Sequence, residues 1–195
     1  DTNLTILKNN GDGTFMAPVN SALAFAPTDL TIGDFDGDGD LDLAAASFFT
    51  DKVAILLGNG DGTFATAVTY DTGAGPTSVA VVDIDDDGGL DVLTAKLYDG
   101  SVSLLLGNGD GTLAPAVVVP VSGSIVASDL GHLDGDGDLD WILSSYGSAR
   151  WFVFRNDGAG VMTTAQSFLA PAAASCSVFL DFDNDRDLDL ALVDE

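Results

Sequence analysis

The sequence has very few basic residues, one cysteine and one histidine. Six Lys and Arg stand against 31 Asp and Glu, so the formal net charge is −25 at pH 7. Such a charge disfavours nucleic acid and anionic membrane surfaces as partners and favours cations. The single Cys176 excludes an internal disulfide framework, and no Cys/His cluster is available for zinc. Because Cys176 occupies a strand position equivalent to Ser78 and Ala127, we expect it to be a small buried residue without a redox role. From the net charge we expect no nucleic-acid partner.

Long apolar runs are also missing. The best candidate, "LAPAVVVPVSGSIVA" (113–127), is interrupted by proline and glycine and is shorter than the roughly 18 residues of a membrane span. We therefore expect no membrane insertion. The chain has no initiator Met and no signal-peptide pattern, so we expect it to be a mature form or an excerpt. Its apolar content of 46% is too high for a disordered acidic tail and predicts a folded protein.

The sequence repeats itself every 49 residues. Asp34, Asp83, His132 and Asp181 each open an Asp-rich stretch, and neighbouring stretches are 49 residues apart. A second signature keeps the same step and reads "NNGDGTF" (9–15), "GNGDGTF" (58–64), "GNGDGTL" (107–113) and "NDGAGVM" (156–162). The pattern predicts one repeat domain, 1–195, with units of roughly 1–49, 50–98, 99–147 and 148–195.

Each unit shows the pattern of four short strands. In the second complete blade, the predicted strands are 76–84, 90–95, 101–108 and 111–119. They are rich in Val, Leu, Ile and Thr and are bounded by Gly, Asn, Asp and Pro. The Gly-Asp-Gly signature lies between the third and fourth strands and is typical of a tight turn. Four antiparallel strands repeated at this spacing predict an all-β propeller of four-stranded blades.

The Asp-rich stretches predict calcium loops between the first two strands of each blade. Oxygen atoms at alternate positions of a sharply turned loop can converge on Ca²⁺, which takes six to eight oxygens. Position 7 is expected to offer its backbone carbonyl, as Gly89 must in the second loop. The candidate ligands of loops one, two and four are Asp34, Asp36, Asp38, Asp40 and Asp42; Asp83, Asp85, Asp87, Gly89 and Asp91; and Asp181, Asp183, Asp185, Asp187 and Asp189.

The third loop departs from this pattern. His132 stands where an Asp opens the other loops, and Asp134, Asp136, Asp138 and Asp140 follow it. Because imidazole is a poor calcium ligand, we expect this site to be weak, completed by water, or empty. No nucleophile or second base accompanies His132, so a catalytic role is not expected.

The fourth loop departs at a different position. Arg186 replaces the glycine that the other loops have at Gly39, Gly88 and Gly137. Glycine adopts positive φ at no steric cost, whereas arginine does not. The fourth turn is therefore expected to be strained or differently shaped.

The sequence argues against two alternatives, an EF-hand loop and a magnesium site. An EF-hand needs a Glu at position 12, where this chain has Ala45, Thr94, Leu143 and Leu192. Mg²⁺ usually retains several waters rather than filling a protein cage. Three to four Ca²⁺ ions are therefore expected. At 100 times its dissociation constant each would add about 2.7 kcal/mol, together roughly the net stability of an ordinary domain. Calcium is thus expected to act as a folding cofactor.

The motifs "IGDFDGDGDLDLAAAS" (32–47), "VAVVDIDDDGGLDVLTA" (79–95) and "LLGNGDGTF" (56–64) resemble those of a known family. They are similar to the FG-GAP and VCBS-type repeats of bacterial secreted and surface proteins, which are related to the blades of integrin α-subunit heads. The resemblance extends over all four units. It implies calcium-binding propeller blades with the strand before each Asp loop innermost, an extracellular location, and roles in adhesion, ligand binding or scaffolding.

The phase of the repeat divides one blade between the two ends of the chain. The N-terminal pair (3–9 and 13–19) and the C-terminal pair (177–182 and 188–193) each supply half of it. Closure within one chain would give a four-bladed ring, pairing between chains an eight-bladed ring or a filament, and an excerpt a longer propeller. Whole-number phasing favours a self-contained unit.

The leading functional hypothesis is a noncatalytic module of a secreted or cell-surface bacterial protein. It would bind a protein or glycan ligand outside the cell, with a variant in which it assembles into a surface fibre or other homo-oligomer through its divided blade. The alternative is a carbohydrate-binding lectin, for which the candidate stacking residues are Tyr70, Tyr98, Tyr146 and Trp151, although core packing is the favoured interpretation of these aromatics. The scarcity of His, Lys and Arg argues against an enzyme.

Overall fold

The computed structural model describes residues 2–97 and 100–194, and within them every regular element is a strand. The strands are β1 (Asn3–Ile6), β2 (Val19–Ala22), β3 (Asp29–Gly33), β4 (Asp42–Ser47), β5 (Lys52–Leu56), β6 (Val68–Asp71), β7 (Pro76–Val82), β8 (Asp91–Lys96), β9 (Ser101–Leu105), β10 (Val117–Pro120), β11 (Ile125–Gly131), β12 (Asp140–Ser145), β13 (Arg150–Arg155), β14 (Thr163–Leu169), β15 (Ala174–Leu180) and β16 (Asp189–Asp194). The described residues form no helix long and apolar enough to cross a membrane.

The strands form three complete blades and two half blades. Strands β3–β6, β7–β10 and β11–β14 make antiparallel four-stranded sheets in sequence order, and β1–β2 and β15–β16 make separate two-stranded sheets. The Asp-rich loops join the first and second strands of each complete blade, and the Gly-Asp-Gly turns join the third and fourth. This confirms the all-β fold of four-stranded antiparallel blades, and each end of the chain carries two strands of a blade in a separate sheet.

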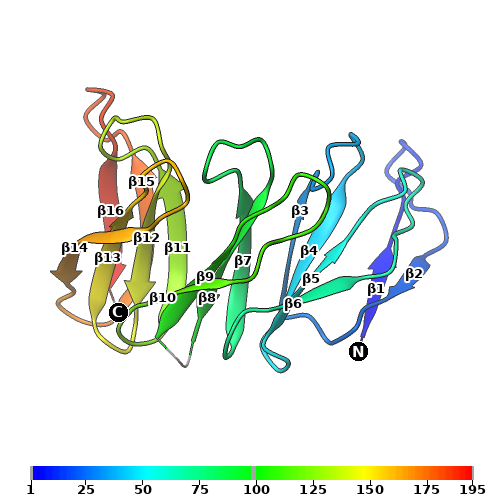
Figure 1. Cartoon of the computed structure of the whole chain (residues 1–195), viewed down its shortest axis with the longest axis horizontal. Coiled ribbons are helices and arrows are strands. Elements are labelled where there is room, and N and C mark those ends of the chain that lie inside the picture. The colour runs from blue at the N-terminus through cyan, green and yellow to red at the C-terminus, as the bar shows by residue number, and fades with distance from the viewer. Residues whose placement is uncertain (1, 98–99, 195) are drawn as a thin grey trace.

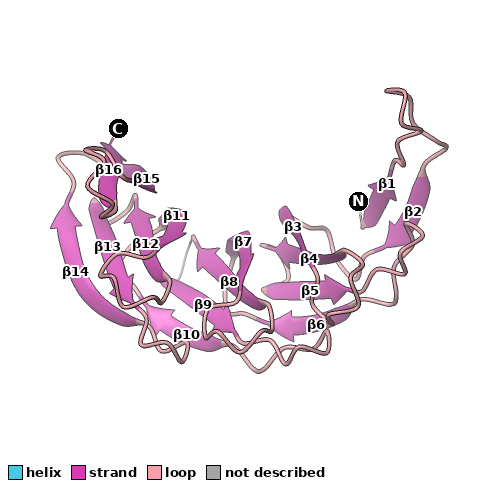
Figure 2. Ribbon diagram, turned by 90° about the horizontal axis from the view of Figure 1, so that it is seen from above, coloured by secondary structure: helices cyan, strands magenta, loops and turns pink. Residues whose placement is uncertain are grey.

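The blades stand side by side along an open arc. Figure 2 shows the first strands β3, β7, β11 and β15 on the concave side and the last strands β6, β10 and β14 on the convex side. The half blades lie at opposite ends of the arc (Figures 1 and 2). The four repeats turn through only part of a circle, so a four-bladed ring closed within one chain is not formed.

The core lies between neighbouring blades. Strands β4, β8 and β12 are buried at every residue, because both faces of each are covered by a neighbouring blade or half blade. Their sequences accordingly lack polar alternation, as expected of fully buried strands. One cluster joins blade β3–β6 to blade β7–β10 through Phe35, Ile55, Val92 and Leu105, and another joins blade β7–β10 to the next blade.

Two details differ from the expectations. The fourth strand of the second complete blade begins at Val117 rather than at 111, because the turn continues through an isolated bridge between Gly107 and Leu113. Cys176, which its position on the strand predicts to be a small buried residue, is exposed.

Candidate metal centre

Each Asp-rich loop begins at the end of a first strand and is folded by its own side chains. In the first loop, Gly37 and Gly39 have φ of +73° and +90°, which turns the chain sharply after β3. The two carboxylate oxygens of Asp34 accept hydrogen bonds from the backbone N–H groups of Gly37 (2.9 Å) and Gly39 (3.0 Å). The turn therefore holds the opening aspartate over the loop.

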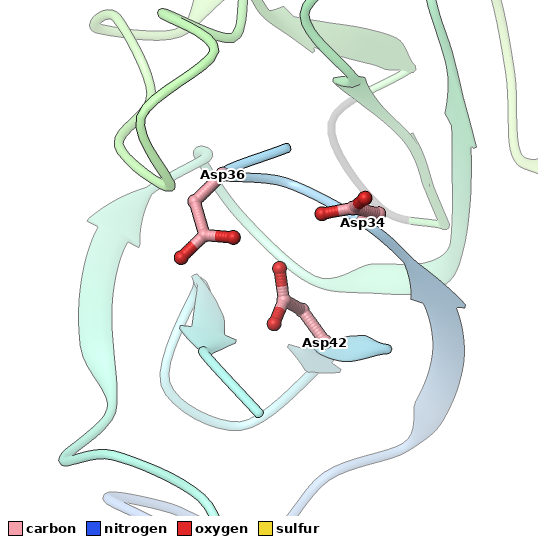
Figure 3. A group of neighbouring side chains, drawn as sticks. All are labelled: Asp34, Asp36 and Asp42. Carbon is pink, nitrogen blue, oxygen red and sulfur yellow. The ribbon is translucent and has the colours of Figure 1, made fainter. Parts of the chain in front are cut away.

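The folding of the loops brings three carboxylates together in three of the four units. Figure 3 shows those of Asp34, Asp36 and Asp42 facing one another. In each group, one oxygen from every residue lies within 4.8 Å of the others. The groups are Asp34, Asp36 and Asp42; Asp83, Asp85 and Asp91; and Asp181, Asp183 and Asp189. These residues occupy positions 1, 3 and 9 of their loops.

The spacing and chemistry of these groups fit a calcium ion. Calcium–oxygen distances of about 2.3–2.6 Å allow two ligand atoms on opposite sides of one ion to be about 5 Å apart. The oxygen atoms of each group lie within 4.8 Å of one another, which is compatible with that span. Three carboxylates and no nitrogen or sulfur donor make a hard, anionic site of the kind that Ca²⁺ prefers.

Positions 5 and 7 are not part of these groups. The Asp38 side chain accepts a hydrogen bond from the backbone N–H of Asp40 at 2.8 Å, and that of Asp87 accepts one from Gly89 at 2.7 Å. In the fourth loop, Asp185 accepts one from Asp187 at 2.9 Å. These bonds shape the loop, and ligation by positions 5 and 7 stays a prediction.

The aspartate at position 9 has a second role that the sequence reasoning missed. Asp42 is buried, and its two oxygens accept hydrogen bonds from the backbone N–H groups of Phe35 and Gly58, both at 2.7 Å. The first bond closes the Asp loop, and the second ties it to the turn after β5. Asp91 and Asp140 make the corresponding bonds in the next two blades. The sequence does carry an indication of this role, because position 9 is aspartate even in the loop that begins with histidine.

The carboxylates are electrostatically unfavourable without a cation. Burial, which is only partly offset by hydrogen bonds from the Gly107 and Ile84 N–H groups, raises the pKa of Asp91 to about 6. Burial also raises the pKa of Asp36 and of Asp85, and the neighbouring carboxylates add to the effect. A bound divalent cation would favour the ionised forms.

The third loop is built differently. Nδ1 of His132 lies 3.0 Å from the backbone carbonyl oxygen of Asp138, the atom expected to be the position-7 ligand. Since a carbonyl only accepts, the ring nitrogen is the donor. Nε of Arg155 lies 3.3 Å from Oδ2 of Asp134. Among the described residues, which include all of this loop, Asp134, Asp136, Asp138 and Asp140 form no group like the other three.

The fourth loop keeps its acidic group despite Arg186. The arginine has φ of +82°, close to the +90° of Gly39 and Gly88, and its N–H donates to Asp181 as Gly39 donates to Asp34. The turn therefore has the same shape as in the other loops and places an L-residue in the left-handed region. The structure therefore does not show a differently shaped turn, and the positive φ of Arg186 is expected to carry a steric cost.

Two of the four candidate sugar-stacking aromatics are packed into the protein. Trp151 is buried and donates from Nε1 to the Cys176 carbonyl at 3.3 Å. Tyr70 packs against the cluster between the first two complete blades, and its hydroxyl accepts from the Leu113 N–H at 3.1 Å. Tyr146 is exposed, and Tyr98 lies outside the described residues.

Several solved structures share this fold. The chain matches an Agrocybe aegerita lectin described as recognising non-reducing terminal N-acetylglucosamine, with TM-score 0.65, 22% identity and coverage of 95% of this chain and 54% of the lectin. A Bacteroides uniformis protein described as a candidate 6-phosphogluconolactonase gives TM-score 0.69 and 22% identity over 90% of this chain and 53% of its own. A Lactobacillus plantarum protein matches with TM-score 0.57 and 22% identity, and the match covers 84% of this chain and 49% of that protein.

At these identities the likeness establishes the fold alone, and the chain spans about half the length of the solved structures it matches. Among curated proteins, none matches. A sequence profile described as the FG-GAP-like repeat matches four times, at residues 1–45, 34–94, 83–143 and 132–192. Because these matches together extend over residues 1–192, the chain belongs to the FG-GAP-like repeat family.

Proposed function

We propose that this protein is a noncatalytic, calcium-stabilised propeller module that acts in recognition, adhesion or scaffolding outside the cell. The observation that carries the proposal is the recurrence of one acidic group, at loop positions 1, 3 and 9, in three of the four repeats. A chance cluster of surface acids would not recur at a fixed step. In each unit the group spans the connection between the first two strands, so an ion there would stabilise the blade.

The same chemistry supports the proposed location outside the cell. Extracellular calcium modules work with dissociation constants of about 10⁻⁴–10⁻³ M, which suits loops in which three carboxylates come together. The net charge of −25 would also keep such a protein away from nucleic acid and anionic membranes. A noncatalytic role is supported by the one histidine, whose Nδ1 is engaged by a backbone carbonyl within its own loop.

Thermal melting with calcium, with magnesium and with chelator tests the structural role. Three sites at 100 times their dissociation constants would contribute about 8 kcal/mol, or about 15–30 °C in melting temperature for a protein of this size. Asp36→Asn, Asp85→Asn and Asp183→Asn together should abolish most of this gain. The matched control is Asp12→Asn, in an exposed turn, which should keep it. A melting temperature that does not respond to calcium would refute the proposal.

The second candidate function, carbohydrate binding, is favoured by two repeated grooves. One of about 400 Å³ is lined by 21–24 and 64–67, and one of about 390 Å³ by 70–73, 115, 116 and 118. Most of their lining residues are related by the 49-residue step, since 21–24 correspond to 70–73 and 66–67 to 115–116, so each groove lies between the outer strands of successive units. The lectin that shares the fold supports the idea by analogy. A glycan array in the presence of calcium tests it, and binding lost in Phe64→Ala would assign the first groove.

A further inference from the structure

Asn156 reaches from the third complete blade to the Asp-rich loop of the second. Its side-chain Nδ2 donates a hydrogen bond to the backbone carbonyl oxygen of Ile84 at 2.5 Å, although the two residues are 72 positions apart in the sequence. Both residues are buried. The amide has one orientation, because its Oδ1 accepts from the Gly158 N–H at 3.2 Å and Nδ2 is then the donor. The bond therefore joins two blades in the interior of the molecule.

Ile84 is in contact with every member of the second acidic group. It lies between Asp83 and Asp85 in the sequence, and its N–H donates to Oδ2 of Asp91 at 2.7 Å. These three aspartates make up the group. The Ile84 carbonyl belongs to the peptide that leads into Asp85. A donor that holds this oxygen therefore also restricts the backbone that carries Asp85.

The turn that contains Asn156 also covers Asp85. Gly160 of this turn lies against the aspartate, because a Cβ placed on the glycine would be 3.7 Å from the Asp85 Cβ. Oδ1 of Asp85 is buried and accepts no hydrogen bond from any described residue. A buried carboxylate oxygen without a donor is unfavourable unless a cation binds it. The third blade thus covers an atom of the second loop that is suited to hold a metal ion.

The contact recurs one blade earlier, with a different donor. There the carbonyl oxygen of Phe35, which corresponds to Ile84, accepts from the Gly111 N–H of the following blade at 2.9 Å. Asn156 stands where the first two complete blades have glycine, so in the third blade a side chain supplies the donor. Because two different donors serve the same carbonyl position, the contact is a regular feature of the interface between blades.

We propose that Asn156 is a positioning residue for the second calcium site, and that calcium bound there strengthens the contact between the second and third complete blades. The inference rests on the proposed function, because it concerns one of the same acidic groups. Coupling between metal binding and blade contact is reciprocal, so the loss of either should weaken the other.

Calcium titration of variants that keep a single acidic group tests the role of Asn156. Asp36→Asn with Asp183→Asn leaves the second group, and Asp85→Asn with Asp183→Asn leaves the first. Adding Asn156→Ala to the variant that keeps the second group should weaken calcium binding about 10-fold, because the buried Ile84 carbonyl loses its donor. In the variant that keeps the first group, the same change should leave the affinity unaltered.

The controls separate positioning from a general loss of stability. Asn156→Ala keeps Cβ and the backbone N–H that donates to Asp140, so the blade should still fold. Asn108→Ala is the matched control, since this exposed asparagine donates to Thr112 within its own turn and should not alter binding. An unchanged affinity of the second group, or an equal loss in both variants, would overturn the inference and leave the proposed function standing. Absence of calcium binding in both variants would overturn the two together.

Hydrogen exchange gives a second test that needs no change at Asn156. The backbone amides of 156–162 should exchange more slowly with calcium than with chelator, although the described residues of the third loop form no acidic group. Asp85→Asn should remove this protection, whereas Asp36→Asn should keep it. Exchange that is the same with calcium and with chelator, or protection that survives Asp85→Asn, would overturn the coupling between the second site and the third blade.

Discussion

The backbone N–H of Asn156 donates a hydrogen bond to Oδ1 of Asp140 at 3.1 Å, linking the third Asp-rich loop to the turn that follows β13. Oδ2 of the same carboxylate accepts from the Leu133 N–H at 2.9 Å. Asp140 is buried, and its loop lacks the acidic group found in the other three. The side chain therefore holds two parts of the blade together where a metal-ligand role does not account for it.

Asp140→Asn should destabilise the protein even in chelator. The amide has one oxygen, so one of the two buried N–H groups would lose its acceptor at a cost of about 1–3 kcal/mol. At about 2–4 °C per kcal/mol, the melting temperature should fall by roughly 2–12 °C. Asp136→Asn is the matched control, since Asp136 is exposed in the same loop and should change the melting temperature by less than 2 °C or so. If both variants lowered the melting temperature equally, the two hydrogen bonds of Asp140 would not stabilise the blade as inferred.

His132→Asp combined with Arg155→Leu should give the third loop a calcium site. The first change restores the opening ligand and frees the Asp138 carbonyl, and the second supplies the leucine that the first two complete blades have at Leu57 and Leu106. Titration calorimetry should show one more calcium equivalent, and the calcium-dependent stability should rise by about 2.7 kcal/mol at 100 times the dissociation constant. Arg155→Leu alone is the control, and an unchanged stoichiometry in the double variant would contradict the interpretation of the loop.

Acid should stabilise the protein in chelator and destabilise it in calcium. The folded-state pKa of Asp91 is about 6, above its ordinary value of 3.8, so the folded state holds more protons between these values. Stability is then lost as the pH rises through this window and regained as it falls. The pKa values of Asp36 and Asp85 move in the same direction.

Melting at pH 5 and pH 7 checks this sign. The chelated protein should melt at the higher temperature at pH 5. With calcium the order should reverse, because the metal needs deprotonated carboxylates. The lowered pKa values of Asp12, Asp61 and Asp110 act below pH 4 and leave this comparison untouched. A chelated protein that melts lower at pH 5 than at pH 7 would contradict the burial of Asp91.

The repeat made the blades and the acidic loops predictable from the sequence, because every unit carries the same strand pattern and the same aspartate spacing. Alternation in a tight loop predicted that positions 1, 3, 5, 7 and 9 would converge, and in three loops the structure brings the side chains of positions 1, 3 and 9 together. The second bond of Asp42, to the Gly58 N–H, did not follow, because it joins residues 16 apart that only the β4–β5 pairing brings together.

The sequence also did not predict that the blades would form an open arc. The openness of the arc depends on the rotation between neighbouring blades, which is set by side chains such as Phe35 and Leu105 between the sheets rather than by the repeat length. Core packing was the favoured interpretation of Trp151, but the sequence did not show which elements would cover it. Its burial comes from its place between the third complete blade and the half blade, where its indole N–H reaches the Cys176 carbonyl.

Arg186→Gly should stabilise the fourth loop. At φ of +82° an L-residue carries a steric cost of about 1–2 kcal/mol, whereas glycine carries none there. The greater freedom of glycine in the unfolded chain returns about 0.4–1 kcal/mol, which leaves a net gain of up to about 1.5 kcal/mol, or a few degrees in melting temperature. Arg186→Ala separates strain from charge, because it removes the guanidinium but keeps Cβ. If both variants raised the melting temperature equally, the gain would come from the lost charge, and the backbone at Arg186 would not be the source of the strain.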